Sequence, residues 1–180
     1  MRVIAGSAKG RRLVGPDTRN TRPLMDRARE ALFSALGSQV IDAEVLDLFA
    51  GSGSIGIEAL SRGARRVIFV EKGRAALAAL QQNLATVGFD GAVVVSQPVE
   101  GFLASVTGAF DLVFCDPPWA MSTDEVERLM VSAGSIVAEG GEFIVHRHQA
   151  DRQPETAGWR LATARRYGDG KIYRYVKEPI

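Results

Sequence analysis

The chain has 180 residues, 46% of them hydrophobic, so it can bury a full core and falls within the usual size of one domain. Its single cysteine excludes a disulfide framework within the chain and favours a reducing cytoplasm. No apolar run approaches the length of a membrane span and no signal peptide is recognisable, so we expect a cytoplasmic protein without membrane contact.

The net charge of +1 conceals an uneven distribution of charge along the chain. Residues 1–30 carry eight basic and three acidic side chains, a net charge of +5, and residues 146–180 carry a net charge of +4. The middle of the chain, residues 31–145, carries a net charge of −8. Two basic ends around an acidic body favour a polyanionic partner held by the ends, and an ordinary solvated surface is the alternative.

The first 15 residues predict a small β-hairpin, with strands over 2–6 and 11–14 around a loop of small residues. The segment has few apolar residues, so we expect it to contribute little to the core, and residues 16–23 resemble a linker. We therefore predict a basic N-terminal arm over 1–20 and one domain over 21–180. The basic side chains of the arm are Arg2, Lys9, Arg11, Arg12 and Arg19.

After a helix predicted over residues 26–36, strands and amphipathic helices alternate, which indicates βαβ units and a parallel sheet. Two further strands joined by a Gly-Asp-Gly turn predict an antiparallel hairpin at the end of the chain. The expected fold is α/β and Rossmann-like, with a seven-stranded, mostly parallel sheet. The predicted strands are 45–49, 66–71, 92–95, 112–115, 141–145, 159–167 and 171–176, and the helices between them are 55–62, 74–87, 99–106 and 123–137.

A glycine-rich loop ends the first of these strands and opens the next helix. Gly51, Gly53 and Gly56 form the pattern G-x-G-x-x-G, in which glycines let the backbone turn tightly and approach a ligand. Glu71 lies twenty residues after Gly51, at the end of the next strand, where a carboxylate can accept hydrogen bonds from ribose hydroxyls. The pattern fits NAD and S-adenosylmethionine (AdoMet), and Asp47 before the loop favours AdoMet, because NAD loops normally follow an apolar strand.

A second loop follows the apolar strand 112–115 and reads Asp116-Pro117-Pro118-Trp119. The prolines stiffen the backbone and donate no hydrogen bond. The loop therefore presents a carboxylate, the Pro117 carbonyl and a flat ring, which together suit a planar base with an exocyclic amine. A plain Pro-Pro turn with a packed ring is the alternative. Carboxyl ends of parallel strands share one edge of a sheet, so we expect this loop, the glycine loop and Glu71 to converge.

Other single residues carry weaker predictions. Cys115 lies in an apolar strand and is interpreted as a buried hydrophobe, not a nucleophile. His146 and His148 are expected to follow the fifth strand in surface or supporting roles, because their spacing does not match a zinc site, and we predict no metal. Trp159 is assigned to the core. Glu58 is interpreted as a buried partner of the glycine loop.

Taken together, these segments resemble the bacterial RsmD family of 16S rRNA guanine-N2 methyltransferases over nearly the whole length. Residues 22–33 are similar to its R-P-x-x-D-x-x-R-E-A-L-F segment, and 6–11, 47–56, 116–119 and 167–169 fit its other motifs. Trp119 departs from the family, in which tyrosine or phenylalanine is more usual, but it retains a ring that can stack.

The resemblance implies a class I AdoMet-dependent fold and methylation of the exocyclic N2 of guanine 966 in 16S rRNA. We further expect a monomer that meets the rRNA within the small ribosomal subunit. Asp116 and the Pro117 carbonyl would orient the amine, Asp116 could take its proton, and Trp119 would stack on a guanine turned out of the RNA. The basic residues of the arm would contact RNA. The implied AdoMet site comprises Arg22, Pro23, Asp47, Phe49, Ala50, Gly51, Ser52, Gly53, Glu71, Lys72, Gln97, Pro98, Val99 and Asp116.

Three rival functions stay open at this point. A DNA amino-methyltransferase would use the same site but usually carries a separate base-reading domain. A protein glutamine N5-methyltransferase would prefer asparagine at position 116 and would not explain the basic ends. A non-enzymatic RNA-binding protein would not need both Asp47 and Asp116. The sequence leaves undecided whether naked rRNA or an assembled subunit is bound.

Overall fold

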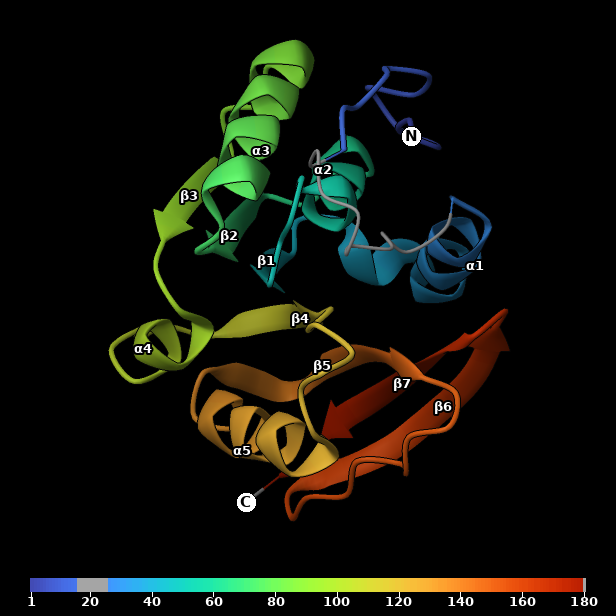
Figure 1. The fold of residues 1–180 in the computed structure, drawn as a ribbon, viewed down its shortest axis with the longest axis vertical. Coiled ribbons are helices and arrows are strands. Elements are labelled where there is room, and N and C mark those ends of the chain that lie inside the picture. The colour runs from blue at the N-terminus through green and yellow to red at the C-terminus, as the bar shows by residue number, and fades with distance from the viewer. Residues whose placement is uncertain (16–25, 180) are drawn as a thin grey trace.

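The computed structural model describes residues 1–15 and 26–179. Its centre is a seven-stranded sheet in the order β3-β2-β1-β4-β5-β7-β6 (Figure 1). The first five strands pair in parallel, and β7 is antiparallel to both β5 and β6. The predicted mostly parallel sheet with a C-terminal antiparallel hairpin is confirmed. The strands are β1 (Glu44–Leu48), β2 (Arg66–Glu71), β3 (Ala92–Ser96), β4 (Phe110–Cys115), β5 (Val137–His148), β6 (Trp159–Tyr167) and β7 (Gly170–Lys177).

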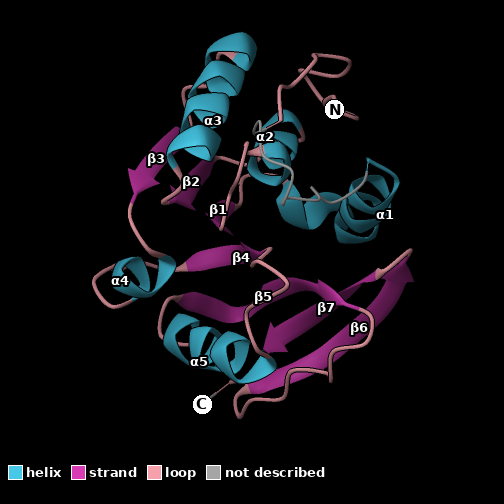
Figure 2. Cartoon of the chain, viewed as in Figure 1, coloured by secondary structure: helices cyan, strands magenta, loops and turns pink. Residues whose placement is uncertain are grey.

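Helices cover both faces of the sheet, so the central strands are apolar on both sides (Figure 2). On one face, Ile57 and Leu80 belong to a core cluster beneath the first three helices. On the other face, Phe102 and Met130 belong to a second cluster. The helices are α1 (Asp26–Leu36), the 3₁₀ helix η1 (Gly37–Val40), α2 (Ser54–Ser61), α3 (Arg74–Val87), α4 (Val99–Leu103) and α5 (Thr123–Ala133).

Two predicted boundaries were wrong in the same region. The helix predicted to reach residue 137 ends at Ala133, and the fifth strand begins at Val137 and continues to His148. The apolar pair Ile136 and Val137 fits the last turn of an amphipathic helix equally well, but both side chains are buried in the second core cluster at the start of β5. Trp159 lies in the same cluster and donates from Nε1 to the Met130 carbonyl at 3.1 Å, so its assignment to the core is confirmed.

The N-terminal segment, residues 1–15, differs most from expectation. It has a single antiparallel bridge, between Arg2 and Arg12, in place of two strands. Val3, Ala8 and Leu13 are buried in the main core cluster, so the expectation that the segment contributes little to the core was wrong. The predicted boundary at residue 20 lies outside the described residues.

This segment is attached to α2 by hydrogen bonds. Glu58 is fully buried, and its carboxylate accepts from the backbone N–H groups of Ile4 at 2.8 Å and Ala5 at 3.0 Å. The Arg62 guanidinium donates to the same carboxylate at 2.7 Å. Glu58 therefore holds the N-terminal segment, and its predicted role as partner of the glycine loop was wrong. Gly6 has φ +83°, and a Cβ there would overlap the carbonyl of Ser61, so only glycine fits this approach.

None of the described helices combines the length and the apolar character that crossing a membrane requires.

Candidate active site

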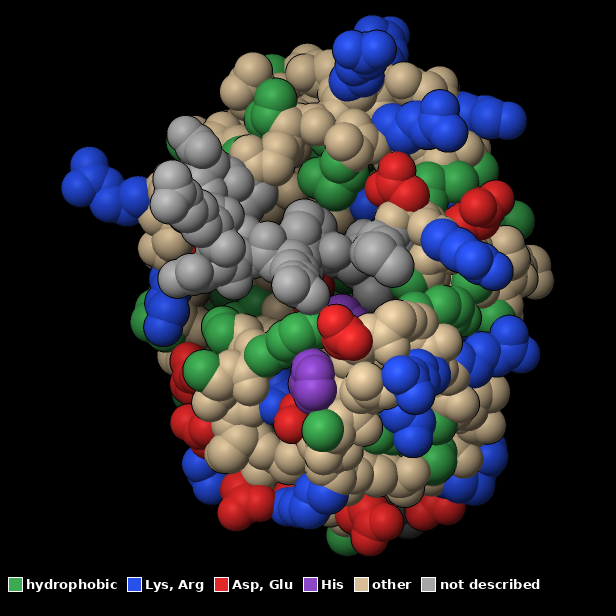
Figure 3. All heavy atoms as spheres, turned by 45° about the vertical axis from the view of Figure 1, so that its right-hand side comes forward, with side chains coloured by type: hydrophobic (Ala, Val, Ile, Leu, Met, Phe, Trp, Pro, Cys, Tyr) green, Lys and Arg blue, Asp and Glu red, His purple; other side chains and the backbone are tan. Residues whose placement is uncertain are grey.

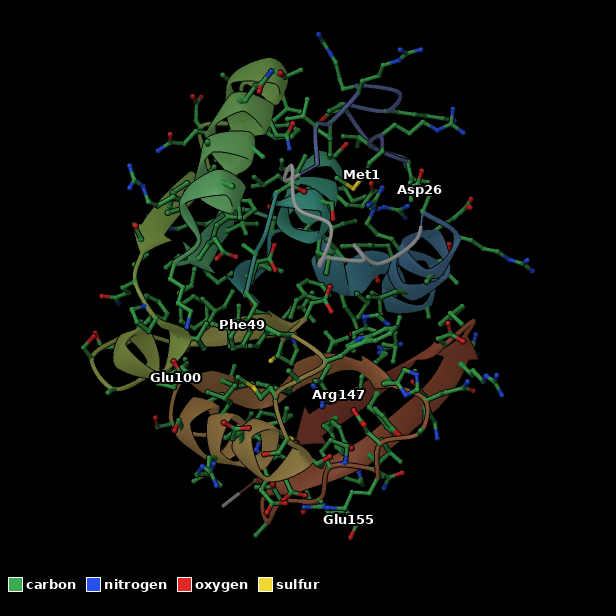
Figure 4. The ribbon with its side chains drawn as sticks, in the orientation of Figure 1. Met1, Asp26, Phe49, Glu100, Arg147 and Glu155 are labelled. Atoms are coloured by element: carbon green, nitrogen blue, oxygen red, sulfur yellow. The ribbon has the colours of Figure 1, made fainter. Side chains whose placement is uncertain are left out.

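The carboxyl ends of β1, β2 and β4 lie at one edge of the sheet and bring the three predicted loops together. Leu48, the last residue of β1, pairs with Val70 on one side and with Cys115 on the other. The chain after β1, which begins with Phe49 (labelled in Figure 4), therefore lies between Glu71 and Asp116. The predicted convergence of these loops is confirmed.

The glycine loop has an unusual backbone conformation. Phe49, Gly51 and Gly53 have φ values of 58°, 58° and 83°. A left-handed conformation costs a residue with a side chain about 1–3 kcal/mol, and such strain often accompanies a functional loop. A Cβ on Gly53 would overlap Leu80 of α3, and one on Gly56 would overlap the ring of Phe69. The third glycine of the motif therefore permits close packing of α2 on the sheet.

Glu71 closes the glycine loop from the side. One carboxylate oxygen accepts from the N–H of Gly51 at 2.8 Å, and the other accepts from the N–H groups of Lys72 at 2.8 Å and Gly73 at 2.7 Å. An ionised carboxylate has about four acceptor positions, so the oxygen bound to Gly51 can accept one further hydrogen bond. The predicted role of Glu71 toward a ribose is chemically consistent with this geometry. The one remaining acceptor position suits a hydrogen bond from one ribose hydroxyl more readily than from both.

Asp47 lies beneath the glycine loop and not on its surface. Its side chain is 1% exposed, and it accepts from the N–H of Gly56 at 2.9 Å. Burial raises the pKa of this carboxyl from 3.8 to about 8, and the nearby carboxylates of Asp116 and Glu71 act in the same direction. Asp47 therefore supports the start of α2, and its predicted contact with AdoMet stays a prediction.

The loop after β4 has the predicted arrangement. Pro117 is buried, Pro118 is exposed and the ring of Trp119 is 37% exposed. The Pro118 carbonyl accepts from the N–H of Met121 at 2.9 Å. Among the described residues no donor contacts the carbonyl of Pro117. Asp116 has a side chain that is 21% exposed, which leaves it accessible at the sheet edge.

Two residues of β5 support this loop. A supporting role was one of the two expected for His146, but neither its contact with Asp116 nor the role of Arg147 was predicted from the sequence. Nδ1 of His146 lies 2.9 Å from Oδ1 of Asp116. The buried Arg147, labelled in Figure 4, donates to the carbonyls of Pro118 at 3.4 Å and Met121. The expectation that the histidines follow the fifth strand was wrong, because both lie on it. The pairing of Cys115 with Val145 places residues 116 and 146 side by side, a register that the sequence alone does not fix.

A third missed residue, Asn83 of α3, links the glycine loop to the N-terminal segment. Its amide donates to the carbonyls of Ser52 and Val14, both at 2.9 Å, and accepts from the N–H of Val14 at 2.8 Å. An asparagine on the buried face of an amphipathic helix was the available signal, since buried polar groups require partners. Residues 1–15 are thus fastened both to α2 and to the loop.

The remaining predicted site residues differ in how far they are exposed. Lys72 and Pro98 are exposed, Ala50 and Gln97 are half-buried, and the side chains of Ser52 and Val99 are buried. Arg19, Arg22 and Pro23 lie outside the described residues. Cys115 is buried, and burial raises the pKa of its thiol, which disfavours a nucleophilic role. Among the described residues, no three His, Cys, Asp or Glu side chains are grouped as a metal would require.

A broad hollow of about 450 Å³ lies away from this edge, between residues 153–157 and the strands β6 and β7. None of the predicted site residues lines it. Its lining is mixed, with the apolar Trp159, Leu161 and Tyr175 beside polar loop residues. We therefore place the candidate active site at the converging loops and not in this hollow.

Comparison with known proteins identifies relatives along nearly the entire chain. Residues 1–176 match the model of a family described as "Conserved hypothetical protein 95". The chain is 35% identical to "Ribosomal RNA small subunit methyltransferase D" of Escherichia coli, over 99% of this chain and 90% of the relative. The structure of a putative methyltransferase from Escherichia coli superposes with a TM-score of 0.87 at 35% identity and covers 99% of this chain and 98% of that one.

A more distant neighbour extends the comparison of the fold. The magnesium protoporphyrin IX methyltransferase of Synechocystis, whose structure holds bound AdoMet, superposes with a TM-score of 0.67 at 18% identity. The superposition covers 84% of this chain and 79% of that protein. At this identity the likeness concerns the fold alone, which is that of class I methyltransferases.

Proposed function

Because the chain belongs to the family that includes Ribosomal RNA small subunit methyltransferase D, we propose that it transfers a methyl group from AdoMet to the exocyclic N2 of a guanine in 16S rRNA. One observation carries the proposal: the acceptor loop 116–119 and the glycine loop lie at the same edge of the sheet. We further propose guanine 966 as the target and the assembled small subunit as the substrate, with the protein acting as a monomer in the cytoplasm.

The residues of the glycine loop fit AdoMet in three respects. The positive φ angles at Gly51 and Gly53 let the loop turn tightly, and Gly51 is partly exposed at the turn. Glu71 keeps an acceptor position for a ribose hydroxyl. Gln97 and Pro98 follow β3 at the same edge and are the proposed neighbours of the adenine. When bound, AdoMet supplies a methyl group made electrophilic by the positive sulfonium.

The residues of the acceptor loop perform the rest of the chemistry. The guanine ring would stack on Trp119, which is 37% exposed and offers an aromatic ring to a planar base. Its amine would donate to the Asp116 carboxylate and the Pro117 carbonyl. These acceptors favour the nitrogen as it becomes pyramidal and positively charged, and they are preset by the stiff prolines, so they need little reorganisation. Asp116 then takes the proton that the methylated nitrogen releases.

The N-terminal segment is the proposed contact with the phosphate backbone of the RNA. Arg2, Lys9, Arg11 and Arg12 are exposed on it. Figure 3 shows Lys and Arg side chains along much of the rim of one face, interspersed with acidic side chains at its left and lower edges, and histidine nearer its centre. Contacts from such a rim would go to phosphates and would position the RNA without reading its bases.

The test is transfer of a labelled methyl group to four substrates: naked 16S rRNA, isolated small subunits, DNA, and a protein that presents glutamine. Digestion to nucleosides should yield labelled N2-methylguanosine, from the subunits in preference to naked RNA. Label in DNA or in the protein alone would refute the proposal. In calorimetry, Glu71→Ala should weaken AdoMet binding by about tenfold, the cost of one lost hydrogen bond to a charged group. An unchanged affinity would remove Glu71 from the site.

A further inference from the structure

His146 occupies a buried position directly beside the proposed acceptor. It lies on β5 with 9% of its surface exposed, and its Nδ1 is 2.9 Å from Oδ1 of Asp116. The side chains of His146 and Asp116 are 10% and 21% exposed. Both groups are therefore partly shielded from water. A hydrogen bond in such a shielded place is stronger than one on an open surface.

The opposite side of the imidazole meets Gly170, the first residue of β7. A Cβ at this position would overlap Nε2 of His146 and would lie 3.0 Å from its Cδ2. Gly170 does not have a positive φ, so its backbone conformation suits any residue. The glycine is thus required by the space that the imidazole fills, and the ring is held between the carboxylate of Asp116 and the backbone of β7.

The proposed reaction uses Asp116 as an ionised carboxylate, which only accepts hydrogen bonds. We therefore assign the tautomer in which Nδ1–H of His146 donates a hydrogen bond to Oδ1 of Asp116. This bond leaves Oδ2 of Asp116 for another donor. The neighbouring Arg147 cannot serve the same purpose, because its guanidinium is engaged with the carbonyls of Pro118 and Met121 and with Asp151 at 2.8 Å.

We infer that His146 is a positioning residue, which fixes the Asp116 carboxylate through Nδ1–H so that Oδ2 faces the amine of the base. The inference rests on the proposed function. In the transfer step the N–C bond forms from the nitrogen lone pair, and the C–S bond breaks with its electrons on sulfur. The proton of the nitrogen passes to Oδ2 of Asp116, while His146 keeps its own proton. A carboxylate free to rotate would lose this alignment, and small misplacements of a reacting group are costly.

The experiment compares three variants with the wild type in steady-state methylation of the rRNA substrate. His146→Ala removes the donor, and we expect kcat to fall by about 10- to 100-fold with little change in KM for RNA or in AdoMet affinity. His146→Asn places an amide N–H near the position of Nδ1 and should recover most of this loss. Gly170→Ala should displace the ring and reproduce the slow kcat, although His146 itself is intact.

Gly101→Ala is the matched control, because a Cβ at Gly101 meets nothing within 4 Å, and it should behave as wild type. A wild-type kcat in His146→Ala would overturn the inference, as would an Asn variant as slow as the Ala variant. A loss confined to KM or to thermal stability would also overturn it. If the wild type methylates a different substrate, the proposed function fails, and the same variants on that substrate still decide the role of His146.

Discussion

Replacing Glu58 by glutamine is expected to loosen the N-terminal segment from α2. The two carboxylate oxygens accept from the N–H groups of Ile4 and Ala5, and glutamine has only one acceptor oxygen. One buried backbone donor would then face an amide N–H₂, at a cost of about 1–3 kcal/mol. The guanidinium of Arg62, now bonded to the carboxylate at 2.7 Å, would lose its charged partner, at a further cost of about 1 kcal/mol.

The sum is about 2–4 kcal/mol, which is a large share of the stability of an ordinary domain. For a chain of this size it corresponds to a fall in Tm of about 4–16 °C. Glu44→Gln is the control, because Glu44 pairs with the exposed Arg65 and such surface pairs contribute at most about 1 kcal/mol. The measurement is thermal unfolding together with amide hydrogen exchange at residues 4 and 5. Equal stability of the two variants, with unchanged exchange at these amides, would refute the attachment.

Three further outcomes are expected. Asp116→Ala should lower kcat about 100-fold or more and leave AdoMet affinity nearly intact, and near-normal turnover in this variant would show that Asp116 is not the acceptor. In the same assay Trp119→Ala should impair binding of the base, whereas Trp119→Tyr should have a mild effect. Because the folded-state pKa of Asp47 is about 8, the folded state binds this proton more tightly than the unfolded state does, so the free energy of unfolding should fall as pH rises from about 4 to about 8. Asp47→Asn should flatten this pH dependence in denaturant unfolding, and an unchanged dependence of the free energy on pH would contradict the raised pKa of Asp47. Replacing Arg11 and Arg12 by alanine should reduce the slope of log affinity against log salt by about 0.7–0.9 per lost phosphate contact, and a slope equal to wild type would place the RNA contact elsewhere.

The sheet and most of the site could be predicted because their signals are local. Strands rich in valine and isoleucine alternate with amphipathic helices, and parallel strands bring their carboxyl ends to one edge whatever their exact register. The family assignment is also confirmed. The contact of His146 with Asp116 could not be predicted, because it depends on the pairing of Cys115 with Val145 and on the space beside Gly170. Both are properties of strands that are distant in sequence.

The N-terminal segment shows a second kind of limit. Val3, Ala8 and Leu13 recur every five residues, which matches neither the period of a helix nor that of a strand. They are buried in the main core cluster, and the groups that attach the segment, Glu58 of α2 and Asn83 of α3, lie 53 to 69 residues away from their partners along the chain. Counting apolar residues in the segment therefore underestimates its share of the core.

This attachment places the proposed RNA contacts in a fixed relation to the chemistry. α2 begins at the glycine loop, and at Glu58 and Ser61 it holds the N-terminal segment, where the Ser61 hydroxyl accepts from the N–H of Ala8 at 3.0 Å. Asn83 binds Ser52 of the loop and Val14 of the segment at once. Phosphates held by exposed arginines on a freely moving arm would not set where a guanine falls. The segment is instead held by the same helix that begins at the glycine loop. Phosphates bound to it would therefore lie at a fixed distance from the methyl donor, so the segment would position the RNA as well as contribute affinity.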